Sequence, residues 1–537
     1  MMRLAMILTL VACASLGMLS SGYANPQGAK EVSEAPMSHE PLETCFAEPP
    51  VSEGQELSVE CGYVLVPETR GSNDGRTVKL GFMRVKSGQG KAHSPFFILD
   101  GGPGQTAISQ ENLMLLKPQL LGQVLQDRDI VFLEQRGTRN TSVYLDCPES
   151  TNAAWTVYDQ GMSEEEANEF EVGLFKRCIA GFKSQGVNLD SYNSVAIAAD
   201  VDAARQALGY EQIIYYGASY GAQLGQHVMR DFPGSLEAVV LDGANSLSRK
   251  SWVEDRAQDA QWGIDNLTKL CSQDPVCQET FDIPGLIEAN LALFADGPLP
   301  YRYTDPSNRE LTIEGVVTAD DLVSFFFGMQ GSRISAFSLP ATLQIMQDGG
   351  ADKVVELLGP QQGSALLASR SGTADTGMAM LMHEAVVCSD DPVHSTDEVI
   401  MDGTSPYAAR FGAIVAREYV LACSVLGMEE LPDSTDVNVS VDIPVLVLSG
   451  SLDVSTPAYR SQIVADALPN ATHLVFPGRT HVQLSGINLC AFNVLSQFTR
   501  NPEGALDTSC MQNAPVMGFS LPDGTLTTDQ GEAESEQ

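Results

Sequence analysis

The chain has 537 residues, 43% of them hydrophobic, which is enough for one large domain with an insertion or for two to three domains with buried cores. Its formal net charge is −38, from 69 acidic against 31 basic residues, and this argues against nucleic acid or an anionic membrane surface as a partner. Composition alone does not identify a substrate.

Residues 1–24 have the pattern of a secretory signal peptide. Arg3 precedes an apolar run over residues 4–19, and the pattern Gly22-Tyr23-Ala24, with small residues at its first and last positions, predicts cleavage after Ala24. Residues 10–13 also resemble a lipoprotein cleavage box, but the chain after Cys13 stays apolar, which disfavours anchoring at that cysteine. No later run reaches the roughly 18–20 apolar residues of a membrane span. We therefore expect an exported protein, periplasmic or secreted, with no transmembrane span after signal removal.

The cysteine content favours disulfides over a metal site. There are 11 cysteines, and removal of Cys13 with the signal leaves an even number in an exported chain. No Cys-x-x-Cys or His-x-x-x-His spacing is present, so we expect no metal and no other cofactor. Connectivity cannot be deduced from spacing, but neighbours in the sequence suggest five pairs: Cys45–Cys61, Cys147–Cys178, Cys271–Cys277, Cys388–Cys423 and Cys490–Cys510.

After a Pro-, Glu- and Ser-rich segment, predicted as a flexible leader over residues 25–50, the chain alternates between strand and helix patterns. Two β-prone segments around a Gly/Asn/Asp turn predict an antiparallel hairpin over residues 59–66 and 77–85. A helix is expected over residues 194–208 and another over 222–232. Short apolar strands are expected at residues 96–99, 130–133, 213–216, 238–241, 443–448 and 473–476. This alternation predicts an α/β fold, with a mostly parallel sheet and helices on both faces.

Residues 251–442 interrupt this rhythm and are predicted as a largely helical inserted cap domain. Its better helical segments are residues 320–327, 338–346 and 408–425, whereas the Gly- and Ser-rich piece 359–377 is expected to be a loop. The core domain would then consist of residues 51–250 and 443–515, and residues 516–537 form a predicted acidic, disordered tail.

The pattern Gly217-x-Ser219-x-Gly221 lies between a strand and a helix, which is the context of a nucleophilic serine on a sharp turn. Residues two before and two after the serine must be almost free of side chain, and both are glycine. The alternative is a small-residue turn with an incidental serine.

A serine hydroxyl needs a base to take its proton and an acid to orient that base. Asp453 follows the strand 443–448 and His481 follows the strand 473–476, so both are expected at the carboxyl edge of the sheet with Ser219. Asp242, after the strand 238–241, is the alternative acid. The remaining histidines lie before the core, within a helix, at a strand or in the cap: His39, His93, His227, His473, His383 and His394.

Acyl transfer also needs N–H donors for the developing oxyanion. The backbone N–H of Tyr220 is one candidate, and the N–H of Gly102, in the glycine-rich loop after the strand 96–99, is the other. The alternative for this loop is a plain Gly/Pro turn.

Five motifs in this order resemble the α/β-hydrolase peptidases typified by proline iminopeptidase, and especially their exported tripeptidyl-aminopeptidase-like (TAP-like) branch. The motifs are Gly101-Gly102-Pro103-Gly104, Gln135-Arg136-Gly137-Thr138, Gly217-Ala218-Ser219-Tyr220-Gly221, Gly450-x-x-Asp453-x-x-Thr456-Pro457 and His481, and Cys490 and Cys510 also resemble that branch. The resemblance covers about residues 60–250 and 440–512. It departs from the proline iminopeptidases at Asp100, where they usually have His, at Glu134, where they usually have Asp, and at Asn140.

The resemblance implies an α/β-hydrolase fold and a metal-free serine exopeptidase that acts on peptide amino termini through an acyl-enzyme, under a cap that admits only chain ends. Such a cap should offer carboxylates to a substrate ammonium. Glu384 resembles in position the cap glutamate of the iminopeptidases, and Asp390 and Asp391 are further candidates; each could equally be a solvated or salt-bridged residue.

Two other functions fit parts of the sequence. A carboxylesterase acting on small esters would use the same triad, so only the cap could separate it from a peptidase. A non-catalytic binding protein on this scaffold would be expected to have lost Ser219, Asp453 or His481, and all three are present. The expected partner is thus a peptide or a small ester, and the oligomeric state is left open.

Overall fold

The structure, a computed structural model, describes residues 38–49, 57–72, 75–87, 93–371, 377–512 and 517–528. The predicted signal peptide with Cys13, the leader residues 25–37 and the end of the predicted tail lie outside the described residues. Within the described residues, we find no helix that combines the length and the apolar character needed to cross a membrane.

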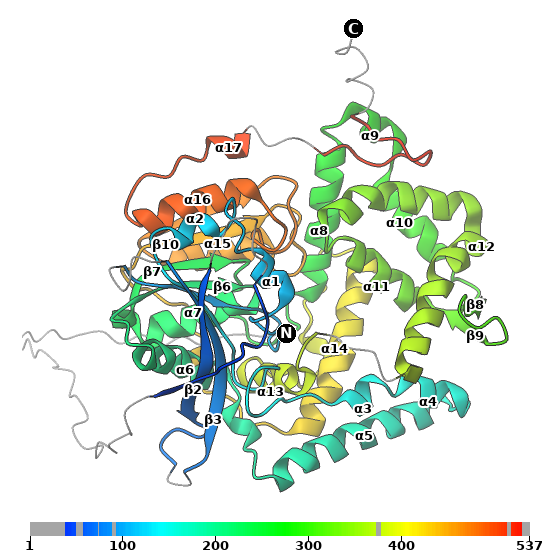
Figure 1. The fold of residues 1–537 in the computed structure, drawn as a ribbon. Helices are drawn as coiled ribbons and strands as arrows, with labels where there is room; N and C mark the ends of the chain where they lie inside the picture. Colours follow the sequence, from blue (N-terminus) through cyan, green and yellow to red (C-terminus); the bar gives the residue numbers. More distant parts are fainter. Residues whose placement is uncertain are drawn as a thin grey trace, which may run out of the picture. The chain divides into compact units, whose positions relative to one another are not determined.

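One nine-stranded sheet forms the centre of the core domain (Figure 1). The strand order is β1-β2-β3-β5-β4-β6-β7-β10-β11; the pairs from β5 to β11 are parallel, and β1, β2 and β3 join antiparallel at one edge. The strands are β1 (His39–Pro41), β2 (Ser58–Pro67), β3 (Thr77–Lys86), β4 (Phe96–Leu99), β5 (Ile130–Leu133), β6 (Ile213–Ala218), β7 (Leu236–Asp242), β10 (Val445–Gly450) and β11 (Ala471–Phe476). The predicted hairpin and the six predicted apolar strands are confirmed.

Helices cover both faces of the sheet, which explains why its inner strands are apolar throughout. Successive residues of a strand point to opposite faces; Phe97 and Leu99 of β4 belong to one apolar cluster, and Phe96 and Ile98 to the other. The first cluster includes residues of α6 (Ser194–Ala207), α7 (Tyr220–Asp231) and α15 (Ala458–Ala467). The second includes residues of α1 (Gln110–Met114), α2 (Gly122–Leu125) and α16 (Leu489–Arg500).

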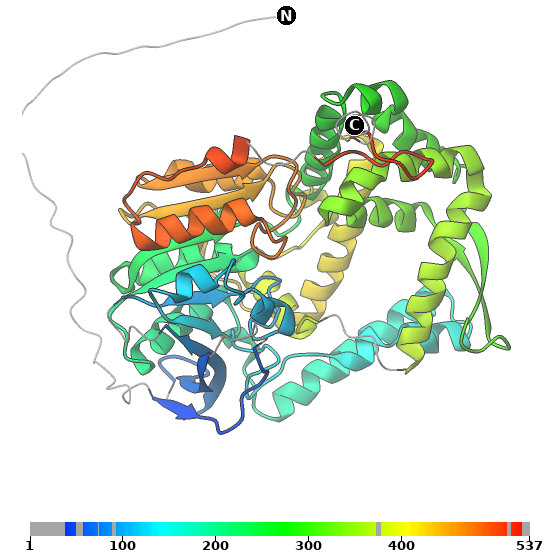
Figure 2. The same ribbon diagram turned by 45° about the horizontal axis from the view of Figure 1, so that its top comes forward.

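The inserted region 251–442 is largely helical and lies beside the core (Figures 1 and 2). Its longer elements are α8 (Arg256–Cys271), α9 (Pro275–Thr280), α10 (Ile283–Ala292), α11 (Ala319–Met329), α12 (Arg333–Ser371), α13 (Met380–Asp390) and α14 (Pro406–Leu426), with the hairpin β8 (Leu299–Thr304) and β9 (Thr312–Val317). The three predicted helical segments fall within α11, α12 and α14.

The loop predicted over residues 359–377 is wrong up to Ser371, because α12, which is kinked at Gly350, continues to that residue; residues 372–376 lie outside the described residues. The glycines there serve close packing rather than a turn. A Cβ added to Gly359 would lie 3.0 Å from the Cβ of Tyr301, and one added to Gly363 would lie 2.3 Å from Cδ1 of Tyr303. These glycines let the unpredicted hairpin β8–β9 lie against the helix.

A second segment joins the cap, although the sequence assigned it to the core. The helices α3 (Pro148–Thr151), α4 (Ala154–Asp159) and α5 (Glu164–Ser184) lie with the cap helices in both views (Figures 1 and 2). Ser369 of α12 accepts a hydrogen bond from Trp155 N at 3.1 Å and donates one to Asn152 O at 2.8 Å. The guanidinium of Arg370 lies 4.8 Å from the centre of the Trp155 ring.

The described parts of the leader and of the tail are ordered by contacts, which corrects both predictions. In the leader, β1 pairs with β2, and Cys45 is bonded to Cys61. In the tail, Phe519 is 2% exposed and its ring centre lies 4.7 Å from that of Phe337 in the cap.

Five disulfides are formed, and they join the neighbours in sequence that the cysteine spacing suggests. Their S–S distances are 1.98–2.06 Å, as expected for a covalent bond. The pairs are Cys45–Cys61, Cys147–Cys178, Cys271–Cys277, Cys388–Cys423 and Cys490–Cys510.

Candidate active site

Ser219 occupies a strained turn between β6 and α7. Its φ of 55° and ψ of −119° are rare for a residue with a side chain, and such a conformation costs about 1–3 kcal/mol. A Cβ on Gly217 would lie 2.0 Å from the Gly221 carbonyl oxygen, and one on Gly221 would lie 2.6 Å from Leu99 O. Only glycine fits at either position, and Ser219 N donates to Asp242 O at 2.8 Å, which fixes the turn to β7.

Asp453 and His481 meet beyond the carboxyl ends of β10 and β11. His481 Nδ1 donates to Asp453 Oδ2 at 2.9 Å, and the aspartate side chain is fully buried. Burial alone would raise the pKa of Asp453, but the contact with His481 outweighs it and lowers that pKa. For His481, burial lowers the pKa, whereas Asp453 raises it, and the net shift is upward. The pair therefore favours a charged imidazolium held by a carboxylate.

Thr456 completes the surroundings of this pair, and the sequence did not assign it a role of its own. Its hydroxyl donates to Asp453 Oδ2 at 2.8 Å and lies 3.1 Å from His481 Nδ1. Its backbone N–H and that of Ser455 both donate to Asp453 Oδ1 at 2.9 Å. Both oxygens of the carboxylate are thus fixed, and so is the edge of the imidazole that faces it.

Asp242, the alternative acid, supports the histidine loop instead. Its carboxylate accepts the backbone N–H groups of Gln483 at 2.8 Å and Leu484 at 3.1 Å, and the Tyr216 hydroxyl at 3.0 Å. Burial raises the pKa of Asp242 to about 6. Among the described contacts, none joins this carboxylate to the His481 ring by a hydrogen bond.

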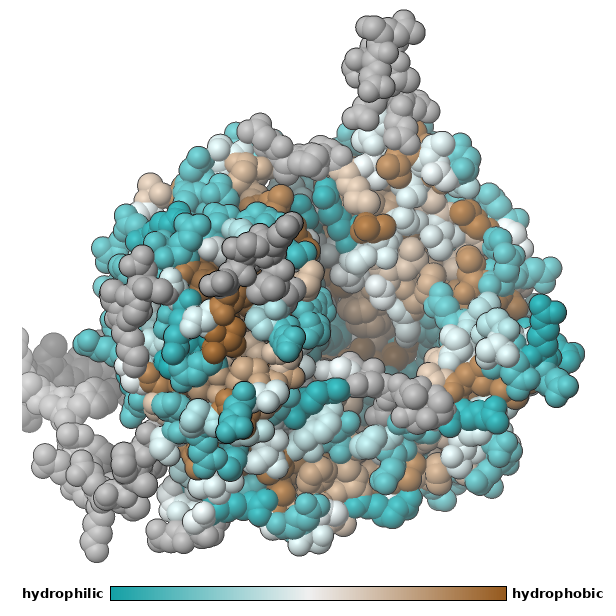
Figure 3. All heavy atoms as spheres, in the orientation of Figure 1, coloured by the Kyte–Doolittle hydropathy of each residue, from teal (hydrophilic) through white to brown (hydrophobic). Residues whose placement is uncertain are grey.

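Ser219 and His481 line one cavity of about 940 Å³ between the core and the cap. Within the described residues, Ser219 Oγ and His481 share no hydrogen bond, and such bonds are often long until substrate binds. The cap contributes apolar lining from Phe327, Phe411 and Val415. The face drawn in Figure 3 is hollowed between core and cap, with apolar residues inside the hollow. A cavity of this size suits a drug-sized ligand or a short peptide.

The backbone N–H groups of Gly102 and Tyr220 are available beside Ser219. Tyr220 is the first residue of α7, so its N–H has no partner within the helix. Gly102 has a φ of 104°, a value that favours glycine. Both residues line the cavity, and neither N–H has a hydrogen-bond acceptor within the part of the chain that is described.

The cap helix α13 supports the loop that carries Gly102. His383 Nδ1 lies 3.0 Å from Pro103 O, and its Nε2 lies 2.6 Å from the Tyr419 hydroxyl. Ala379 N donates to Gly104 O at 2.9 Å. Two of the three departures from the iminopeptidase pattern, Glu134 and Asn140, stabilise the neighbouring loop. Glu134 accepts hydrogen bonds from Ile108 N, Thr106 and Asn140.

The three predicted amine ligands differ in their surroundings. Asp391 forms an ion pair with Arg249 at 2.5 Å, and Asp390 accepts the backbone N–H of Ser194 at 3.2 Å; neither lines the cavity. This corrects the expectation for the two aspartates, whose carboxylates stabilise the fold. Glu384 Oε2 has no partner among the described residues, and burial raises the pKa of Glu384 to about 8. Asp390 Oδ2 also has no partner there, and burial raises the pKa of Asp390 to about 7. Glu384 does not line the cavity itself, but the adjacent His383 does.

Comparisons with known proteins concern the fold and the class of this protein. The alpha/beta hydrolase fold family matches residues 94–326, and the family described as TAP-like protein matches residues 405–510. Serine protease Hip1 of Mycobacterium bovis is 24% identical over 476 residues, covering 83% of this chain and 86% of that protein. Tripeptidyl aminopeptidase of Streptomyces coelicolor is 24% identical over 352 residues, covering 62% of this chain and 60% of that protein. The structure of proline iminopeptidase from Mycobacterium smegmatis aligns with a TM-score of 0.37 at 16% identity, over 82% of this chain and 98% of that one.

The fold and the matched families define the chain as an α/β hydrolase of the serine hydrolase class. Its residues 405–510 match the TAP-like family, and its similarity to a serine protease and to a tripeptidyl aminopeptidase supports a serine peptidase of the α/β-hydrolase type.

The raised pKa of His481 makes a testable prediction for the pH dependence of activity. A general base works only when it is unprotonated, so kcat/KM should fall as the pH drops through the pKa of His481 in the free enzyme. Because the net shift is upward from 6.5, we expect the midpoint of the acid limb above pH 6.5. A pH profile of kcat/KM measures it directly. An acid limb centred near pH 4 would instead point to a carboxylate as the group that must lose its proton.

Proposed function

We propose that the protein is an exported serine exopeptidase that hydrolyses peptide bonds near free amino termini, in the manner of prolyl or tripeptidyl aminopeptidases. The observation that carries the proposal is the shared cavity. A serine on a strained turn and a histidine bound to a carboxylate both line this cavity, beneath the cap. The names of the relatives, a serine protease and a tripeptidyl aminopeptidase, support a peptide substrate. Five disulfides support export, because such bonds persist in oxidising compartments.

In the proposed mechanism, Ser219 Oγ attacks the scissile carbonyl carbon while His481 Nε2 takes the hydroxyl proton. Asp453 holds Nδ1 protonated and stabilises the imidazolium that forms. The N–H groups of Gly102 and Tyr220 stabilise the oxyanion, an interaction worth roughly 3–4 kcal/mol per donor in comparable sites. His481 then donates its proton to the leaving amine, and water attacks the acyl-enzyme by the same route to release the amino-terminal fragment.

Recognition of the free amine is assigned to two cap glutamates near Tyr419. Tyr419 lines the cavity; burial raises the pKa of its hydroxyl to about 12, and the charges of Glu384 and Glu418 contribute to the rise. Glu418 lines the cavity with part of its surface exposed, and partial desolvation by its neighbours raises its pKa. Glu384 has a buried oxygen without a partner among the described residues. A buried carboxylate with an unpartnered oxygen is costly unless a cation or a proton joins it. A substrate ammonium near Tyr419 would satisfy this requirement.

Three fluorogenic amides test the proposed function: a free-amine Pro- or Ala-amide, a free-amine tripeptide amide, and the same tripeptide with its amine acetylated. We expect the free amines to be cleaved and acetylation to lower kcat/KM by about 10–100-fold, since a paired charge is lost. The better free-amine substrate then indicates how many residues are released. If all three amides are inert while a short acyl ester is hydrolysed, the activity is that of a carboxylesterase.

Variants of the two glutamates extend this test. Glu384→Gln and Glu418→Gln should raise KM for free-amine substrates by up to about 10-fold and change the acetylated substrate little. Glu314→Gln is the matched control, because this glutamate is 70% exposed on β9 and, among the residues that the structure describes, forms an ion pair only with Arg302. Equal effects of these substitutions on free and acetylated substrates would show that neither glutamate binds the substrate amine.

A further inference from the structure

The cavity wall contains a cation that its own surroundings satisfy only in part. Arg256, the first residue of α8, lines the cavity together with Trp252, and its side chain is 12% exposed. Its Nη1 lies 3.4 Å from Ser455 O and 3.8 Å from Asp259 Oδ2. Within the described part of the chain, Nε and Nη2 of Arg256 have no hydrogen-bond partner. A guanidinium has five N–H donors, so most of its capacity here is unused.

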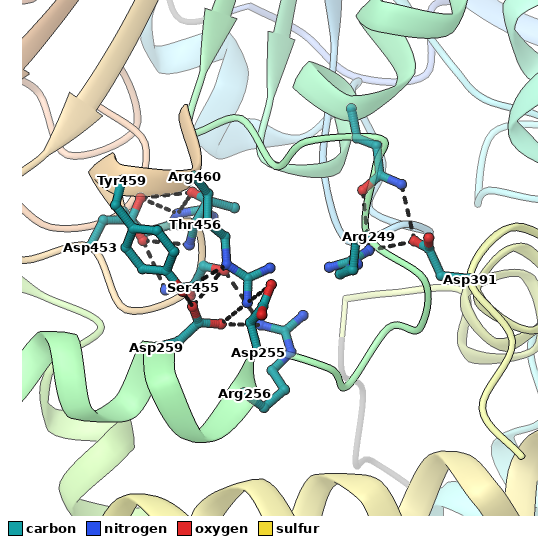
Figure 4. A network of polar contacts seen from close by, with 12 residues as sticks. Arg249, Asp255, Arg256, Asp259, Asp391, Asp453, Ser455, Thr456, Tyr459 and Arg460 are labelled. Atoms are coloured by element: carbon teal, nitrogen blue, oxygen red, sulfur yellow. Dashed lines mark hydrogen bonds and ion pairs between the residues drawn. The ribbon is translucent and has the colours of Figure 1, made fainter. Parts of the chain in front are cut away.

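The nearby carboxylates are occupied by a different arginine (Figure 4). Arg460 Nε donates to Asp259 Oδ1 at 2.9 Å, and its Nη2 donates to Oδ2 at 2.6 Å, a bidentate pair. The same Nη2 lies 3.2 Å from Asp255 Oδ2, and the Tyr459 hydroxyl donates to Asp259 Oδ1 at 2.8 Å. Both oxygens of Asp259 therefore accept hydrogen bonds from Arg460. Arg256 lies farther from this carboxylate, at 3.8 Å, and lines the cavity.

The aromatic wall beside Arg256 offers it no anion either. The Arg256 guanidinium lies 5.2 Å from the centre of the Trp252 ring, and that of Arg249 lies 4.4 Å from it. Arg249 has its own carboxylate in Asp391, whereas Arg256 has none to itself. Burial and the neighbouring arginines outweigh Asp259 and lower the pKa of Arg256 to about 10. All these features favour an anion that arrives from the cavity.

We propose that Arg256 is a specificity-determining residue that binds a carboxylate of the substrate through its unused Nε and Nη2 donors. This inference rests on the proposed function and adds a substrate class, peptides that bear a carboxylate near the scissile bond. The carboxylate can come from an acidic side chain or from the carboxyl terminus of a short peptide. Both present the planar pair of oxygens that a guanidinium binds in bidentate fashion.

Binding of a carboxylate to Arg256 would also change the pKa of His481, the proposed general base. Burial lowers the pKa of His481, and the charge of Arg256 adds to that lowering. A carboxylate bound to Arg256 would cancel part of this charge and make His481 a stronger base. The effect on pH dependence separates a substrate-binding role from a purely structural one.

Two matched substrate series test the proposal. Free-amine tripeptide amides carry Glu or Gln at each position in turn, and short free-amine peptides end in an acid or an amide. We expect one of these carboxylates to raise kcat/KM by about 10–100-fold over its neutral counterpart in the wild type. In Arg256→Gln this preference should fall to below about 3-fold, and Arg256→Lys should retain part of it. The series in which the preference occurs identifies the source of the carboxylate.

The controls separate this inference from the proposed function and from misfolding. Arg302→Gln removes one positive charge from an exposed pair on β8 and should leave the preference unchanged. In Arg256→Gln, the acid limb of kcat/KM on a neutral substrate should move to higher pH, and a loss of folding would not produce this shift. If no peptide is hydrolysed and a serine-directed phosphonate does not label Ser219, the proposed function fails. If peptides are hydrolysed but the wild type shows no acid preference in either series, or if Arg256→Gln keeps it, the inference about Arg256 is overturned.

Discussion

Replacing Ser219 with alanine is expected to lower kcat by roughly 10⁴–10⁶-fold, because the attacking oxygen is lost while the rest of the cavity remains. The residual rate would come from the oxyanion donors and from binding alone. The variant should also lose burst kinetics and labelling by a serine-directed phosphonate. Its fold should persist, because Ser219 Oγ has no hydrogen bond to any described residue, and the turn is fixed by Ser219 N and the two flanking glycines.

A second serine in the same cavity provides the control for this experiment. Ser485 lines the cavity, and within the described segments its hydroxyl donates only to Val482 O, at 3.2 Å. Ser485→Ala removes a hydroxyl from the same space without touching the triad, so it should change kcat by less than about 3-fold. Phosphonate labelling of Ser219→Ala at the wild-type rate would refute the assignment of the nucleophile.

The positions of Ser219, Asp453 and His481 could be predicted from the sequence because each lies within a few residues of the end of a strand. Short apolar runs mark β6, β10 and β11, and parallel strands end at one edge of a sheet, so Ser219, Asp453 and His481 were expected together. The glycines at 217 and 221 mark the turn because a Cβ at either would overlap backbone atoms. Local patterns of this kind depend on few distant contacts.

The remaining features depend on contacts between segments far apart in the chain. Asp391 and Arg249 are separated by 142 positions, and no pattern within either segment links them. With 69 acidic residues, the sequence could not separate structural carboxylates from those near the cavity. The same holds for Arg256, which looks like any charged residue at the start of a helix until Arg460 is seen to occupy Asp259.

Two buried carboxylates, Asp453 and Asp242, lie near His481. Substitution of each by asparagine tests which of them orients this histidine as the general base. Asp453→Asn is expected to lower kcat by about 10⁴-fold, since an amide at this position favours the wrong tautomer of the imidazole. Asp453 accepts from His481 Nδ1, so the loss acts on the base directly. The measurement is kcat and kcat/KM as a function of pH. Because the raised pKa of His481 depends on Asp453, the acid limb of any residual activity should move to lower pH.

Asp242→Asn should behave differently, because Asp242 acts through the backbone. Its carboxylate accepts two N–H groups just after His481 and the Tyr216 hydroxyl, and one amide oxygen cannot replace all three acceptor contacts. We expect a loss of about 1–3 kcal/mol in the free energy of unfolding, since a buried donor is left unpaired. The fall in kcat should stay within about 100-fold, as the contact between His481 and Asp453 is retained. A stable Asp242→Asn protein that loses 10⁴-fold in kcat, beside an Asp453→Asn protein that loses little, would make Asp242 the acid of the triad and reduce Asp453 to a residue that holds the turn.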